Sequence, residues 1–173
     1  MKIMRDLFEN QLQHLYNSEL LIVNALPEML EYATDVELRD IIKTYTQETY
    51  DQKQRLLEIG EYLHMRFKLN DGKFVLGLIE ESRELYQEFS KGFLMDVGII
   101  AKIQHIEHFQ ISAYETALLY AGALDINEVA DRLNETLWEA YEADERCGYY
   151  VKELMFDSNR RDGDTLRRDE GDS

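Results

Sequence analysis

Apolar residues return every three or four positions along five stretches of the chain, which is the spacing of one buried face on an α-helix. The stretches run Met4 to Tyr32, Thr34 to Leu63, Phe74 to Phe89, Gly92 to Gly122 and Ile126 to Phe156. The periodicity of the first resumes after Pro27, so we expect a kink there and not an end. The spacing therefore predicts four long helices and one shorter helix.

Short connections between the long segments predict antiparallel helix pairs. Thr34 with Glu37 has the pattern of a capping box at the start of the second helix. Two antiparallel pairs bridged by a shorter helix make an all-α four-helix bundle, which we expect over residues 1–157. Residues 158–173 contain one strongly apolar residue, Leu166, and are predicted to form a disordered tail.

Charge and composition narrow the choice of partners. The 173 residues carry 19 basic and 35 acidic side chains, a net charge of −16, which repels nucleic acid and anionic membrane surfaces. A single cysteine, Cys147, excludes an intramolecular disulfide framework and cysteine-built metal sites. No apolar run is long enough to span a membrane, and the charged start lacks the apolar stretch of a signal peptide. We expect a cytoplasmic protein that binds neither nucleic acid nor membranes.

A few carboxylates interrupt stripes that are otherwise apolar. Glu19, Glu107 and Asp144 each have mostly apolar neighbours at helical spacing, and Glu48 shares a stripe with Ile41 and Tyr45. The neighbours of Glu139 are polar, which places it on the solvated face. The pattern is thus one inward-facing acid on each of the four long helices.

Four buried carboxylates that converge need a compensating charge or proton. A pair of metal ions supplies it, and oxygen ligands on facing helices favour iron or manganese, with zinc as a further alternative. The other interpretation is that tyrosine hydroxyls, Arg55 or backbone groups satisfy each acid. No Glu-x-x-His occurs, and His105 and His108 point away from the face of Glu107.

The order and spacing of several motifs resemble the YciF-like stress proteins of the ferritin superfamily. The similarity covers about residues 5 to 155 and lies in the segments DLFENQLQHLYNSE, ALPEML, QETYDQKQRL, GLIEE, AKIQHIEHFQISAY and ETLWEAYEAD. The resemblance implies a ferritin-like bundle with extra helices between the two pairs, a di-metal site at its centre and a cytoplasmic stress association. It implies no particular reaction.

Matched position by position, the family pattern places metal ligands at residues that the helical stripes also select. These are Glu19, Glu48, Gln52, Glu107 and Asp144. The chain departs from the pattern at Gln110 and Ala140, where the family has glutamates. Both departures remove negative charge that faces the centre, so affinity for a divalent pair must fall.

Two functions follow from these observations. In the first, the chain is a di-iron-type carboxylate protein acting on oxygen, peroxide or Fe(II), with Glu19, Glu48, Gln52, Glu107, Gln110 and Asp144 around the metal and no catalytic side chain assigned. In the second, it is a metal-free helical stress protein that works by association, and Gln110 and Ala140 favour this alternative. For either function we expect a homo-oligomer, most simply a dimer.

Overall fold

The structure is a computed structural model that describes residues 3–69 and 72–169, with side chains described up to Phe156. All regular elements in these residues are helices, which confirms the predicted all-α class. They are α1 (Met4–Tyr32), α2 (Val36–Tyr62), α3 (Lys73–Glu88), α4 (Phe93–Ala123) and α5 (Asn127–Asp169). Pro27 lies inside α1, which continues past it as expected.

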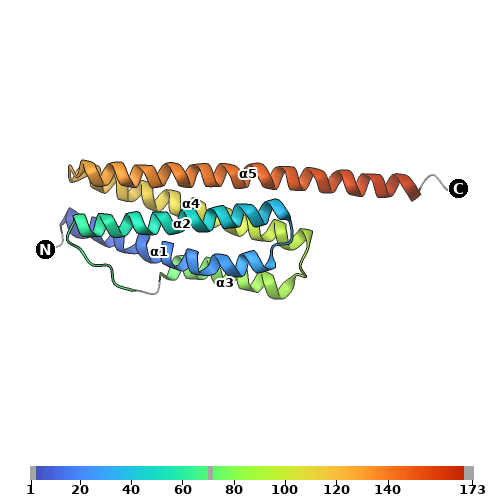
Figure 1. The fold of residues 1–173 in the computed structure, drawn as a ribbon, viewed down its shortest axis with the longest axis horizontal. Coiled ribbons are helices and arrows are strands. Elements are labelled where there is room, and N and C mark those ends of the chain that lie inside the picture. Colours follow the sequence, from blue (N-terminus) through green and yellow to red (C-terminus); the bar gives the residue numbers. More distant parts are fainter. Residues whose placement is uncertain (1–2, 70–71, 170–173) are drawn as a thin grey trace.

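The four long helices form two antiparallel pairs, α1 with α2 and α4 with α5, and the shorter α3 packs against α1 and α4 (Figure 1). The C-terminal part of α5 extends past the other helices. The backbone of α5 is helical to Asp169, into the stretch predicted as a disordered tail. Side chains beyond Phe156 and all of residues 170–173 lie outside the described part, so the domain boundary stays a prediction. None of the described helices is long and apolar enough to cross a membrane.

The apolar core consists of two separate clusters. The α3 cluster contains Ile22, Ile42, Val75, Ile100 and Ile103 among its fully buried members. The end cluster lies toward the opposite end of the long helices and contains Phe8, Leu12, Leu56, Tyr114 and Leu133. The two clusters are separated by about two turns on α1 and α4 and by about three turns on α2 and α5. In this interval α1, α2 and α4 turn polar side chains inward. That polar layer is the region where the sequence places the candidate ligands.

The turn between α1 and α2 is attached to α4 by a buried carboxylate. Asp96, in the first turn of α4, accepts hydrogen bonds from Thr34 N at 2.7 Å, Thr34 Oγ1 at 2.6 Å and Asp35 N at 3.1 Å. The helix cap is Asp35, whose side chain accepts from the amides of Glu37 and Leu38. The predicted cap at Thr34 was therefore wrong by one residue, because Asp96 engages the Thr34 hydroxyl instead.

We predict that Asp96→Ala lowers the free energy of unfolding by about 2–4 kcal/mol, because it removes a buried carboxylate that accepts from two backbone amides and a hydroxyl of the α1–α2 turn. Urea denaturation followed by circular dichroism measures the change. Asp40→Ala is the control, since the contact of Asp40 among the described residues is an exposed ion pair with Lys43, whose loss should cost less than about 1 kcal/mol. Equal effects of the two substitutions would contradict the attachment.

Candidate functional site

The polar layer brings together most of the residues predicted from the sequence. Glu19, Gln52, Glu107 and Gln110 are all buried between the two apolar clusters. Glu48 and Asp144 lie at its margin, with about a quarter of each side chain exposed. The helical stripes therefore selected residues that share one level of the bundle.

Glu19 is fully buried and has one defined partner. The hydroxyl of Tyr114 on α4 donates a 2.6 Å hydrogen bond to Glu19 Oε1. Burial raises the pKa of the Glu19 carboxyl to about 8, the hydrogen bond from Tyr114 opposes that rise, and the nearby Glu107 adds to it. At neutral pH the folded protein therefore holds Glu19 mainly in its protonated form.

Glu107 repeats this arrangement on α4. Burial raises its pKa to about 8 as well, and a hydrogen bond from the hydroxyl of Tyr45 on α2 partly opposes the rise. Each buried acid is thus paired with a tyrosine from a different helix. Protonation and a phenol hydroxyl are two ways to hold a carboxyl in an apolar interior without a metal ion.

Two arginines clamp α2 to α5 on either side of these acids. The guanidinium of Arg55 binds both carboxylate oxygens of Glu139 at 2.9 Å, and Arg146 Nη2 lies 2.6 Å from Glu48 Oε2. Glu48 precedes Arg55 by seven residues on α2, and Glu139 precedes Arg146 by seven on α5. Since the helices are antiparallel, the two pairs are reciprocal: the acid of each helix meets the arginine of the other.

The remaining contacts of this layer also join helices. Gln52 Nε2 donates to Glu139 Oε2 at 3.2 Å, and Arg55 donates to Thr136 Oγ1 at 2.7 Å. Asp144 Oδ1 lies 3.1 Å from Nε2 of His108, an exposed ring that forms an ion pair only when it is protonated. Glu48 and Asp144 are therefore oriented toward basic side chains as well as toward the bundle.

Two predicted ligands keep a buried oxygen that accepts no hydrogen bond within the described residues, Glu19 Oε2 and Gln110 Oε1. A third, Asp144 Oδ1, has only the His108 ring beside it and gains a partner there when that ring is protonated. A proton on Glu19 changes its free oxygen from an acceptor to a donor, and the Gln110 oxygen is an acceptor in the same layer. Carboxylate and amide oxygens of this kind are also suitable ligands for a hard cation.

The arrangement fits a pair of divalent ions poorly. Among the described residues, no group of three or more histidine, cysteine, aspartate or glutamate side chains is placed to hold a metal ion. Glu48 is bound to an arginine, and Gln110 and Ala140 stand where the family pattern has anionic ligands. A divalent pair generally needs more carboxylates than the two that remain at the centre. The ligand assignment itself stays a prediction.

Glu139 belongs to the polar layer although the apolar stripes do not select it. Its neighbours on α5 are polar, so it was assigned to the solvated face, yet its side chain is 31% exposed and makes the bidentate pair with Arg55. The available signal was the matching Glu-to-Arg spacing on α2 and α5. Tyrosine hydroxyls were one of the ways in which the acids could be satisfied, and the structure shows this for Glu19 with Tyr114 and for Glu107 with Tyr45.

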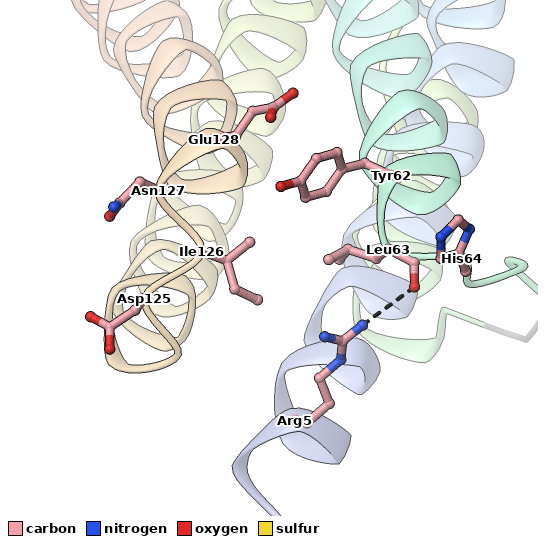
Figure 2. Close-up of a pocket in the computed structure, with 8 residues that line it drawn as sticks. All are labelled: Arg5, Tyr62, Leu63, His64, Asp125, Ile126, Asn127 and Glu128. Carbon is pink, nitrogen blue, oxygen red and sulfur yellow. Dashed lines mark hydrogen bonds between the residues drawn. The ribbon is translucent and has the colours of Figure 1, made fainter.

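A separate pocket of about 590 Å³ lies at the end of the bundle, where the C-terminus of α2 faces the turn between α4 and α5 (Figure 2). Arg5 is in this pocket and donates a 3.3 Å hydrogen bond to the carbonyl oxygen of Leu63. Asp125 and Glu128 also line it and disfavour an anion. None of the predicted ligands lies there.

Comparison with known proteins places the chain in a family. A family model described as a domain of unknown function (DUF892) matches residues 3–156. Protein YciF of Escherichia coli K12 is 30% identical over 141 residues, which cover 80% of this chain and 84% of that protein. The chain belongs to the YciF-like DUF892 family.

Solved structures agree with this membership. The crystal structure of the E. coli stress protein YciF covers 90% of this chain and 98% of its own, with 26% identity and a TM-score of 0.85. YcfI of Rhodopseudomonas palustris covers 85% of this chain and 94% of its own, with 28% identity and a TM-score of 0.82. The predicted resemblance to YciF-like proteins is thus confirmed, and so is the bundle fold.

The raised pKa values of Glu19 and Glu107 predict that the free energy of unfolding falls as pH rises. Between pH 4.5 and 8 Glu19 and Glu107 are ionised in the unfolded chain and protonated in the folded one, so the folded state binds more protons and loses about 1.4 kcal/mol per pH unit for each acid. Glu19→Gln keeps an acceptor for Tyr114 and removes its share. We expect it to be at least about 2 kcal/mol more stabilising at pH 8 than at pH 5.

Denaturant unfolding at several pH values tests this, with the exposed Glu31→Gln as the control that should change neither the stability nor its slope. A Glu19→Gln protein with the same pH slope as the wild type would show that Glu19 is ionised in the folded state at neutral pH.

The Arg55–Glu139 clamp should show strong energetic coupling. Arg55→Met leaves Glu139 without its main partner and is expected to cost about 2–4 kcal/mol, while Arg55→Met with Glu139→Leu should recover at least half of that loss. A double-mutant cycle by urea unfolding measures the coupling. The exposed pair Arg132–Glu58 is the matched control and should couple by less than about 1 kcal/mol.

Proposed function

We propose that this protein is a stress-associated helical bundle that acts by binding other proteins through its outer faces, with an interior that works without metal. The observation that carries the proposal is the set of contacts in the polar layer. Glu19 and Glu107 bind tyrosine hydroxyls, and Glu48 and Glu139 bind arginines, each from another helix. Carboxylates that already bind tyrosine or arginine side chains have little capacity left to coordinate a pair of metal ions.

The relatives support the same direction. The E. coli relative is called a stress protein, and the name of the Rhodopseudomonas palustris relative suggests a structural role. A structural or associating protein needs a rigid bundle and an accessible surface, and no reactive centre. The reciprocal clamps supply that rigidity, because they tie the two helix pairs together.

A second candidate is a bundle that holds one divalent cation, iron or otherwise manganese or zinc, with weak affinity. The specific observation in its favour is that buried oxygens of Glu19 and Gln110 accept no hydrogen bond in the described part of the chain, and that Asp144 Oδ1 has only the exposed His108 ring beside it. Carboxylate and amide oxygens are suitable ligands for hard cations. Binding would have to displace the proton on Glu19, so this candidate predicts that metal affinity rises with pH toward 8.

Glu19→Gln with Glu107→Gln distinguishes the two functions. In cells that lack this gene, we expect the double variant to restore stress survival as well as the wild type, because both side chains still accept hydrogen bonds from Tyr114 and Tyr45. Purified wild-type protein, prepared without metal-affinity resin, should contain less than about a tenth of an equivalent of iron, manganese or zinc. Equal levels of both proteins in the cells are checked by quantitative blotting.

Loss of survival with the double variant, together with about one equivalent of metal in the wild type, would refute the proposal and support the second candidate. Gln110→Glu with Ala140→Glu is the matched gain-of-binding variant. It restores the two carboxylates of the family pattern and should raise Mn(II) affinity at least tenfold by calorimetry. A variant that binds no more Mn(II) than the wild type would show that these departures do not limit metal binding.

A further inference from the structure

The outer face of α5 carries aromatic side chains that the bundle leaves open. Trp138, Tyr141 and Tyr149 are each between 42% and 64% exposed. They line a groove of about 740 Å³, and all but one of its lining residues belong to α5, the exception being Gln104 of α4. From Trp138 to Lys152 the groove follows α5 for about 21 Å, so its shape suits an extended or helical segment more than a compact ligand.

The groove is acidic as well as aromatic. Asp144 and Glu145 line it, and Tyr141 and Tyr149 donate hydrogen bonds to Glu115 and Glu153 at its edges. The only basic side chain in the lining is Lys152. Carboxylates beside aromatic faces attract cations both by charge and through the ring quadrupole.

Elsewhere the chain fills such positions with its own lysines. Lys91 Nζ lies 5.1 Å from the ring centre of Tyr32, and Lys53 Nζ lies 4.8 Å from that of Tyr50. In the part of the molecule that is described, no lysine or arginine lies over the rings of Trp138, Tyr141 or Tyr149. Trp138 contacts Tyr141 edge-on, with 6.3 Å between the ring centres, which leaves ring faces accessible.

We propose that the groove formed by Trp138, Tyr141, Asp144, Glu145 and Tyr149 binds a segment of another protein that carries lysine or arginine side chains. The basic side chains lie over the rings and pair with the two carboxylates. The net charge of −16 draws such a segment toward the protein from a distance. This inference rests on the proposed function, because it names the surface and the chemistry through which the association occurs.

Intrinsic fluorescence tests the groove directly, because Trp138 is the only tryptophan in the chain. The probe is an octalysine peptide with blocked ends, titrated into the full-length protein at 150 mM salt. We expect a saturable change in Trp138 emission. Tyr149→Leu and Glu145→Gln should each weaken binding at least fivefold, and Tyr149→Phe should retain affinity within twofold, since the ring face remains.

The controls separate the groove from diffuse charge. Tyr50→Leu and Glu61→Gln remove an exposed ring and an exposed carboxylate on α2, and both should stay within twofold of the wild type. Equal weakening by Glu145→Gln and Glu61→Gln, or an equal response to octaglutamate, would overturn the proposal. A change in Trp138 emission with protein concentration alone, matched by dimerisation in sedimentation, would also overturn it, since a second copy would then cover the groove.

The two proposals fail separately. Suppose that peptide binding depends on Tyr149 and Glu145, but that the variant with Glu19→Gln and Glu107→Gln loses stress survival. The metal-independent function is then refuted, and the groove proposal stands. If the variant with Glu19→Gln and Glu107→Gln retains stress survival, but Tyr149→Leu does not weaken peptide binding, only the groove proposal is refuted.

Discussion

The structure depends on the cost of keeping carboxylates in the middle of an apolar bundle. Glu19 and Glu107 separate the α3 cluster from the end cluster, and each is removed from water on all sides. An ionised, unpaired carboxylate in such a place costs several kcal/mol. Three features of the layer reduce this cost: the tyrosine hydroxyls donate to the acids, the raised pKa values of Glu19 and Glu107 keep these carboxyls neutral, and the arginines pair with Glu48 and Glu139.

The ferritin-like pattern implies another way to balance buried carboxylates, which is to bind metal ions between them. A di-metal centre balances its carboxylates with external positive charge, and the protein must then keep them deprotonated and free of internal partners. In this chain Gln110 and Ala140 lower the negative charge, while Arg55 and Arg146 provide positive charge from within. Both changes move the layer toward neutrality without a ligand. The interhelical contacts of this layer also fix the register between the two helix pairs.

The sequence predicted the fold well because helix positions are encoded locally. The apolar spacing located all five helices, and the interruption of apolar stripes located Glu19 and Glu107. Glu139 could not be found in this way, because its helical neighbours are polar and it interrupts no apolar stripe. Its partner Arg55 is on another helix, and the choice of partner depends on how the pairs dock. The capping residue was missed for the same reason, since Asp96 belongs to α4.

The long-range nature of these contacts has a consequence for folding. The hydrogen bonds from Tyr114 to Glu19, from Arg55 to Glu139 and from Arg146 to Glu48 join residues that are 95, 84 and 98 positions apart. Each helix hairpin can form from local contacts while its acids are still hydrated, but the layer closes only when the two hairpins meet. We therefore expect water to leave Glu19 and Glu107 late in folding. The rate of that event should depend on protons in solution, because each acid must gain one before it leaves water.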